Sequence, residues 1–290
     1  MLSLEQYRLA RGKEIDNHLE KLLPSEDVKP ELFHKAMRYS LFSGGKRLRP
    51  LLCLAGAEAV ADNFAAALTP ACAIEAMHTY SLVHDDLPAL DDDAERRGKP
   101  SSHVVFGEAQ AILAGDGLLT ISFEWMATSK PVAPYTGADL CLELAQAGGA
   151  QGIVGGQVED VLAEGKAPQE DTLLFIDRLK TVAIIRAAMR IGAMCGGASP
   201  GQLKALTKFA EHFGLARQFI DDIEDAMEGE DSSDIRLQKM TAVTVYGLDG
   251  AKERARQGMN DARKALEEVE LREQGKHIFI EVANLFLSRL

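Results

Sequence analysis

The sequence of 290 residues carries a formal net charge of −12, and 46% of its residues are hydrophobic, which is enough for a sizeable buried core. The acidic balance argues against a nucleic-acid partner, because nucleic-acid binding needs a basic surface. Neither a signal peptide nor a membrane-spanning run is recognisable, so we expect a cytoplasmic protein without an integral membrane segment. We expect reduced, buried thiols at the four cysteines, which show no CxxC spacing: Cys53, Cys72, Cys141 and Cys195.

Helical periodicity dominates the chain, and few segments alternate as strands do. Breaks in the periodic pattern predict about ten or more helices. The breaks fall at Pro24, Pro30, Pro70, Pro131, Pro168 and Pro200. The Glu- and Lys-rich stretch 252–276 is expected to form an exposed helix. Because no linker rich in Pro, Gly or Ser divides the chain, we predict an all-α fold with one large helical domain over residues 1–290.

A basic segment at residues 44–50 reads GGKRLRP and directly precedes the apolar run 51–60. Pro50 suits the first turn of a helix that would begin here. Exposed backbone N–H groups, the positive end of a helix and fixed cations together make a site for a compact anion. An ordinary basic loop is the alternative for this segment alone.

The first acidic cluster, residues 85–93 (DDLPALDDD), follows the apolar helical stretch 74–83. Carboxylates held together on ordered backbone need a counter-ion, and Mg²⁺ prefers oxygen ligands that it shares with substrate phosphates. Pro88 disrupts the helical turn, so the spacing does not choose between Asp91 and Asp92 as a ligand. Two further cations, Arg96 and Arg97, follow within one loop.

The second acidic cluster covers residues 221–225 (DDIED). On a helix the apolar residues Phe209, Phe213, Ala216, Ile220, Ile223 and Met227 share one face. The polar residues Gln218, Asp221, Asp222 and Asp225 lie on the opposite face. An EF-hand loop is excluded because the glycine that it needs at its sixth position is missing. A solvated acidic face is the alternative for this cluster alone, but the two clusters together predict that the chain binds diphosphates through magnesium.

Six segments resemble those of short-chain trans-polyprenyl diphosphate synthases and are most similar to bacterial farnesyl diphosphate synthases, or geranyltranstransferases. They are residues 44–50, 78–98, 111–116, 155–160, 179–188 and 217–225. The resemblance implies a single polyprenyl synthetase domain with a helical bundle of the isoprenoid synthase type around a central active-site cavity. It also implies a homodimer that uses three Mg²⁺ ions, with Mn²⁺ as an alternative.

The resemblance also assigns roles to individual residues. Metal ligands would be Asp85, Asp86, Asp91, Asp221, Asp222 and Asp225. Arg96, Lys180 and Lys239 would bind the allylic diphosphate. The pocket for isopentenyl diphosphate would contain Lys46, Arg49, His78 and Arg97. Thr181 and Gln218 would lie beside the carbon that becomes cationic. Catalysis itself would rest on Asp85, Asp91, Arg96, Lys180, Thr181, Gln218 and Asp221.

The expected reaction is Mg²⁺-dependent head-to-tail condensation of isopentenyl diphosphate with dimethylallyl and geranyl diphosphate to farnesyl diphosphate. Tyr80 and Ser81 lie one helical turn before Asp85, where a growing chain would meet them first, and the resemblance implies that they set product length. Packing in the core is an equally good local explanation for Tyr80. The alternatives are a geranyl or geranylgeranyl diphosphate synthase, a terpene cyclase, or a non-catalytic subunit that regulates a partner synthase.

Two departures from the family pattern stand out. The family usually has Phe before the Gln that precedes the second acidic cluster, whereas this chain has Arg217, which is spaced to pair with Asp221. After Asp225 the family has a longer loop with two lysines. Lys239 matches the second lysine, and the first has no counterpart.

Overall fold

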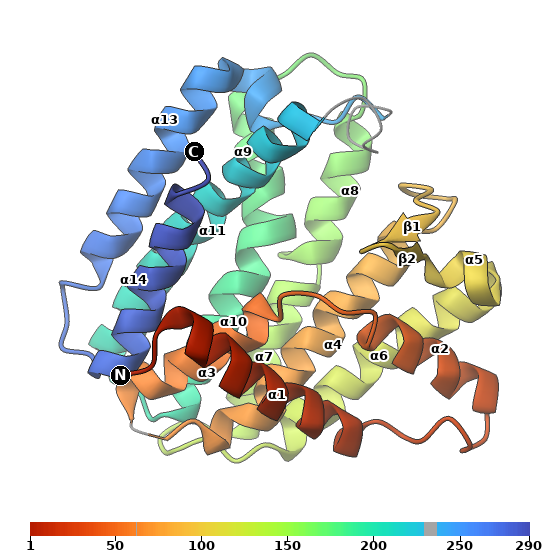
Figure 1. Cartoon of the computed structure of the whole chain (residues 1–290), viewed down its shortest axis with the longest axis horizontal. Helices are drawn as coiled ribbons and strands as arrows, with labels where there is room; N and C mark the ends of the chain where they lie inside the picture. The colour runs from red at the N-terminus through yellow and green to blue at the C-terminus, as the bar shows by residue number, and fades with distance from the viewer. Residues whose placement is uncertain (62, 229–236) are drawn as a thin grey trace.

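The computed structural model describes residues 1–61, 63–228 and 237–290 (Figure 1). Helices fill most of these residues, and more than ten of them are present, which confirms the all-α prediction. Their bounds are α1 (Leu4–Leu22), α2 (Glu31–Leu41), α3 (Leu48–Val60), α4 (Leu68–Asp85), α5 (Ser102–Phe106), α6 (Glu108–Thr128), α7 (Gly137–Gly148), α8 (Ile153–Ala163), α9 (Glu170–Asp177), α10 (Ala183–Cys195), α11 (Pro200–Glu228), α13 (Ala242–Ala265) and α14 (Glu273–Leu287).

Three short elements complete the described chain. A 3₁₀ turn, η1 (Ala65–Ala67), precedes α4, and a π-helical turn, η2 (Arg178–Val182), joins α9 to α10. The strands β1 (Glu95–Arg96) and β2 (Lys99–Pro100) form a small antiparallel hairpin between α4 and α5. This hairpin follows the first acidic cluster, so it fixes the position of the Arg96–Arg97 pair beside that cluster.

The centre of the bundle is formed by α3, α4 and α10 (Figure 1). In α3 every residue from Pro50 to Ala59 is buried, as is typical of a helix that neighbours surround on all sides. α3 packs against α10 and α14, and α4 packs against α6. α11 lies along α13, and η2 contacts both α8 and α11. Packing against these neighbours therefore fixes the positions of the helices that carry the sequence motifs.

Most of the predicted helix breaks occur where the prolines indicated, but Pro70 lies inside the first turn of α4. Two other expectations are wrong. The stretch 252–276 forms parts of two helices, α13 and α14, and α13 buries the small residues of its inner face, among them Ala251 and Ala255. Met227 was expected on the buried face of α11 but is 67% exposed, because this helix extends past the edge of the core.

All four cysteines are free thiols; three are buried and Cys141 is partly exposed. Within the described ranges, the helices are all too short or too polar to cross a membrane.

Candidate active site

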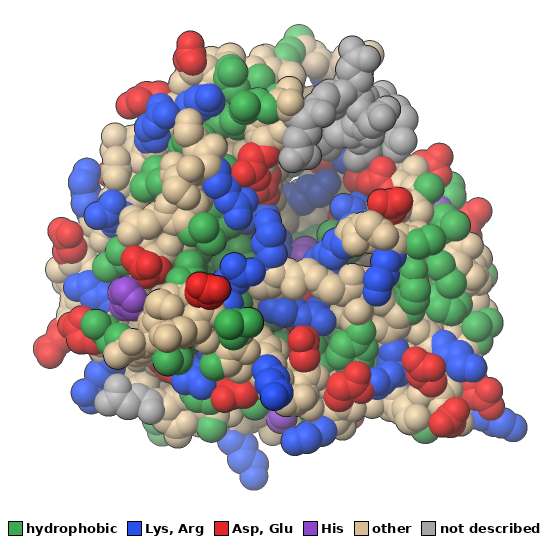
Figure 2. Space-filling model, in the orientation of Figure 1, with side chains coloured by type: hydrophobic (Ala, Val, Ile, Leu, Met, Phe, Trp, Pro, Cys, Tyr) green, Lys and Arg blue, Asp and Glu red, His purple; other side chains and the backbone are tan. Residues whose placement is uncertain are grey.

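A cleft of about 830 Å³ opens where the end of α4, the start of α3, η2 and α11 meet. Figure 2 shows this face of the molecule hollowed, with Lys, Arg, Asp and Glu side chains around the hollow. The cleft, called the main cleft below, brings together most of the predicted site residues. They are Lys46, Arg49, His78, Asp85, Asp91, Arg96, Arg97, Lys180, Thr181, Gln218, Asp221, Asp225 and Lys239.

The first acidic cluster is split by the end of α4. Asp85 is the last residue of the helix and lines the main cleft. Asp86 caps the helix, is buried, and accepts a hydrogen bond from Arg96 Nε at 2.9 Å. Beyond the turn Asp91 lines the main cleft, whereas Asp92 adopts a left-handed backbone conformation with φ of 49° and its side chain is exposed. Asp91, rather than Asp92, is thus the residue that faces the other predicted ligands.

Burial shapes the charge of this cluster. It raises the pKa of Asp85 to about 6, against the opposing effect of Lys180. Burial also raises the pKa of Asp86, although Arg96 acts in the other direction. A carboxyl group with a raised pKa gains from a nearby cation, because a cation restores the preference for the ionised form.

Two lysines link this cluster to α8 through Asp160. Lys239 Nζ donates to Asp91 Oδ1 at 2.8 Å and lies 3.7 Å from Asp160 Oδ2. Lys180 Nζ donates to the same Asp160 oxygen at 2.6 Å. Burial alone would lower the pKa of Lys180, but Asp160 and Asp85 outweigh it and the pKa is raised. Lys180 is thus held as a cation beside the first acidic cluster, and Lys239 forms an ion pair with Asp91 of that cluster.

Asp160 is a site residue that the sequence reasoning missed, although it ends the matched segment 155–160. The π-helical turn η2 carries Lys180, and such turns are frequent at functional sites. α8 approaches this turn at Gly156, where an added Cβ would lie 2.4 Å from the backbone nitrogen of Lys180. Only a glycine allows this close approach, which brings Asp160 within reach of Lys180.

The second acidic cluster is also divided between two sides of α11. Asp221 lines the main cleft and forms an ion pair with Arg217, as their spacing predicted. Asp222 is buried and accepts hydrogen bonds from Gln218 Nε2 at 2.8 Å and from the backbone N–H of Ala242 at 2.6 Å. Gln218 in turn accepts a hydrogen bond from the Thr181 hydroxyl at 2.8 Å.

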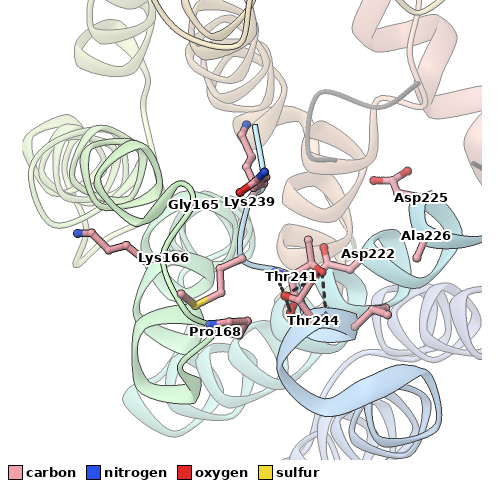
Figure 3. A pocket seen from close by; sticks show the side chains of 12 residues that line it. Gly165, Lys166, Pro168, Asp222, Asp225, Ala226, Lys239, Thr241 and Thr244 are labelled. Atoms are coloured by element: carbon pink, nitrogen blue, oxygen red, sulfur yellow. Dashed lines mark hydrogen bonds between the residues drawn. The ribbon is translucent and has the colours of Figure 1, made fainter. Parts of the chain in front are cut away.

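Asp222 therefore lies outside the main cleft and borders a neighbouring cavity of about 430 Å³ (Figure 3). Figure 3 shows Asp222 beside Thr241 and Thr244, with Asp225 well apart from it. Asp225 borders both spaces. Residues 229–236, which belong to the loop that departs from the family pattern, lie outside the described residues.

The basic side of the main cleft begins with Gly44 and Gly45, whose φ angles of 94° and 117° favour glycine. An added Cβ at Gly45 would lie 2.6 Å from Arg97 Nη1, which donates to the Gly44 carbonyl at 2.6 Å. The basic segment and the Arg96–Arg97 pair are thus brought together across the cleft. Arg47, by contrast, is buried and pairs with Asp16 and Glu75 at 3.0 and 2.8 Å.

Arg49 and His78 lie next to each other on this basic side. Arg49 Nη1 lies 2.9 Å from His78 Nε2. Burial, and then the charge of Arg49, hold the pKa of His78 well below its ordinary value, so the ring is neutral at pH 7 and can accept this hydrogen bond. Burial, and next the charge of Arg217, lower the pKa of Arg49 to about 9. An anion bound here would relieve the crowding of positive charge.

A separate apolar cavity of about 400 Å³, called the side cavity, lies between α4 and α8. Tyr80, Ser81 and His84 line its α4 wall, and Asp85 borders both the side cavity and the main cleft. Tyr80 is 4% exposed and its ring meets His84 edge to face, with ring centres 5.6 Å apart. The opposite wall consists of Ile153, Val154, Gln157, Val158, Val161 and Leu162 from α8.

The fit of these residues to magnesium follows from their donor chemistry. In the described ranges no three carboxylate, imidazole or thiol groups converge closely enough to hold an ion by themselves. Asp85, Asp91 and Asp221 nevertheless line one cleft that is rich in cations. Mg²⁺ is commonly bound by one or two carboxylates and completed by phosphate oxygens, so this arrangement fits an ion that arrives with a diphosphate.

Comparisons with known proteins place the chain in a family. The family model described as polyprenyl synthetase matches residues 30–277. A farnesyl diphosphate synthase from Geobacillus stearothermophilus is 42% identical over 261 residues, which cover 87% of this chain and 88% of the relative. The chloroplastic geranylgeranyl pyrophosphate synthase 12 of Arabidopsis thaliana is 39% identical over 273 residues, 90% of this chain and 75% of the relative.

Solved structures agree in fold. The crystal structure of an FPP/GFPP synthase from Zymomonas mobilis superimposes with a TM-score of 0.87 and 32% identity, and the match covers 98% of both chains. This likeness confirms the predicted bundle of the isoprenoid synthase type. The matching family model, the similar relatives and the shared fold show that the chain belongs to the polyprenyl synthetase family and is a prenyltransferase.

Proposed function

We propose that the protein condenses isopentenyl diphosphate with dimethylallyl diphosphate and then with geranyl diphosphate, giving farnesyl diphosphate and inorganic diphosphate in a Mg²⁺-dependent reaction. The observation that carries this proposal is the division of the main cleft. One part combines carboxylates with Lys180, Lys239 and Arg96, and the other gathers Lys46, Arg49 and Arg97 around His78. Two anionic substrates therefore have two separate places to bind.

The allylic diphosphate would bind at the acidic part. Asp85, Asp91 and Asp221 face this part and would hold magnesium. Asp86 and Asp222 were also predicted as ligands, but both are buried outside the main cleft, so their proposed role is to orient Arg96 and Gln218 through hydrogen bonds. Magnesium bound there would supply Lewis-acid stabilisation of the departing diphosphate. Arg96 and Lys180 would stabilise the same negative charge by direct contact. Asp225 borders the main cleft and completes the proposed ligand set.

Departure of the diphosphate breaks the allylic C–O bond and leaves a carbocation. Thr181 and Gln218, which are hydrogen-bonded to each other at 2.8 Å, would present their oxygen dipoles to that positive carbon. The double bond of isopentenyl diphosphate attacks the cation and forms the new C–C bond. Loss of a proton to the departed diphosphate then restores a double bond, so that the chain gains five carbons.

Isopentenyl diphosphate would bind at the basic part. Arg49 and Arg97 provide guanidinium groups suited to bidentate contacts with phosphate, and the N–H groups around Gly44 and Gly45 add to the positive potential. Neutral His78 positions Arg49 through their 2.9 Å contact. A terpene cyclase has no second diphosphate to bind and would not need this group of cations.

Product length would be set by the side cavity. Because Asp85 borders both spaces, an allylic tail that leaves the metal site would enter between α4 and α8 and meet Tyr80. A wall at Tyr80, about one helical turn from Asp85, favours a C15 product. A geranylgeranyl product is the second candidate, since several relatives carry that name.

We also propose a homodimer. Large apolar side chains are exposed on α5 and α6, among them Val104, Val105, Ile112 and Leu113. An exposed apolar patch of this kind is typical of a surface that a second protein chain covers. The cytoplasmic location stays a prediction from the sequence.

The proposal is tested by incubating purified protein and Mg²⁺ with isopentenyl diphosphate and each of dimethylallyl, geranyl and farnesyl diphosphate, with products read by mass. We expect farnesyl diphosphate from the first two and little product from the third. A C20 product would replace the farnesyl assignment with a geranylgeranyl one. Cyclic hydrocarbon formed without isopentenyl diphosphate would indicate a cyclase, and activity only with an added partner synthase would indicate a regulatory subunit.

A further inference from the structure

Arg217 lies where the acidic and basic parts of the main cleft meet. It precedes Asp221 by one turn of α11 and forms an ion pair with that carboxylate. Arg49 and His78 line the same cleft, and the charge of Arg217 helps to lower the pKa of both, after burial and, for His78, the charges of Arg49 and Arg97. One side chain therefore interacts with a proposed metal ligand and with the proposed pocket for isopentenyl diphosphate.

The surroundings hold Arg217 inside the cleft. Its side chain is only 18% exposed, and its guanidinium lies 5.8 Å from the centre of the Phe286 ring. Arg289 stacks on the same ring at 4.5 Å and is held by Glu224 at 3.3 Å. The buried Nε of Arg217 has no hydrogen-bond partner in the described part of the chain. An unused buried donor is costly, so an acceptor that entered the cleft would be favoured.

We propose that Arg217 couples metal binding at Asp221 to binding of the diphosphate of the nucleophilic substrate. Without metal, Arg217 neutralises Asp221. When a divalent ion takes that carboxylate, the guanidinium is released toward Arg49 and His78 and donates to the diphosphate bound there. This inference rests on the proposed function and adds to it a residue that makes the two sites depend on each other.

The physical basis is competition between two cations for one carboxylate. An oxygen that accepts from a guanidinium is less available to a metal ion. In the empty cleft, Arg217 stays with Asp221 because Arg49 and Arg97 repel it from the basic part. A diphosphate there reverses that repulsion. Metal and diphosphate should therefore bind cooperatively, and by linkage each should strengthen the other by the same factor.

The test measures isopentenyl diphosphate binding by calorimetry in excess EDTA, where no metal contributes. Asp221→Asn keeps the shape of the side chain but removes the charge that holds Arg217. We expect it to bind isopentenyl diphosphate about five- to tenfold more tightly than wild type, as the loss of one partly exposed charge-assisted bond allows. The double variant with Arg217→Met should lose this gain.

Asp225→Asn is the matched control, because it removes the same charge from the same cluster one turn later and leaves the Arg217–Asp221 pair intact. If Asp225→Asn tightens binding as much as Asp221→Asn does, or if the double variant keeps the gain, general charge explains the effect and the coupling is wrong. As a second readout, Arg217→Met should bind Mn²⁺ more tightly in paramagnetic resonance titrations without substrate, and unchanged Mn²⁺ affinity would also overturn the inference. Failure of every variant to bind isopentenyl diphosphate, with or without metal, would instead refute the proposed function.

Discussion

Tyr80→Ala tests whether the side cavity sets the chain length of the product. Removal of the ring extends the cavity of about 400 Å³ along α4 toward Ala76 and Met77, one helical turn of about 5.4 Å further from Asp85. A five-carbon unit is about as long as that turn. The variant should therefore shift the main product from C15 to C20, with little change in the first condensation.

The size of the effect follows from packing. Forcing extra methylene groups against a well-packed wall costs about 1–3 kcal/mol. Tyr80 should therefore lower kcat/KM for farnesyl diphosphate as a substrate by roughly 5- to 150-fold. Its removal should raise kcat/KM for farnesyl diphosphate within that range and leave the value for dimethylallyl diphosphate nearly constant. Because Tyr80 is 4% exposed, the change should also cost about 3–5 kcal/mol of stability, and assays belong well below the lowered Tm.

The assay measures product masses and kcat/KM for each allylic substrate, with folding checked by circular dichroism. Tyr7→Ala is the control, since Tyr7 is fully buried in α1 and lines neither the main cleft nor the side cavity. It should lose stability and keep the wild-type product. In the opposite direction, Ser81→Phe fills the same wall and should favour C10. An unchanged product distribution in folded Tyr80→Ala would mean that Tyr80 is only core packing.

Further predictions concern the metal site and the lysines beside it. Excess EDTA should abolish turnover, and Asp85→Ala should lower kcat by several orders of magnitude at unchanged helix content, because the metal acts chiefly on the leaving group; full activity in EDTA would refute the magnesium assignment. Burial raises the pKa of Asp85 to about 6, so Mn²⁺ affinity should fall as the pH drops below about 6. Without metal, the ionised form of Asp85 is disfavoured in the folded state, so the wild-type protein loses stability as the pH rises through 6. Asp85→Asn cannot ionise at this position and should therefore gain stability relative to wild type over the same pH range. Thermal melts of both proteins at pH 5 and 8 would measure this difference. Asp160→Asn should raise KM for the allylic diphosphate more than for isopentenyl diphosphate, because it frees Lys180 and Lys239 from their shared anchor; equal changes in both constants would contradict that role.

The sequence by itself determined the helical class and the chemistry of the motifs. Both depend on local spacing. Apolar residues that recur every three or four positions specify helices whatever their neighbours are. The pair of Arg217 and Asp221 was also predictable, because residues four apart on one helix are neighbours. The same rule placed Phe213 and Ile220 in the core and failed for Met227, since spacing does not say where the core ends.

Only the tertiary structure decided how residues far apart in sequence meet. The turn at Pro88 sends Asp91 into the main cleft and leaves Asp92 outside, a choice that depends on backbone angles after the helix has ended. Asp160 gained its role from contacts with Lys180 and Lys239, which come from η2 and from the segment before α13. The side cavity likewise needs α8 as its second wall. Helix packing sets these distances, and no single segment contains the information that fixes them.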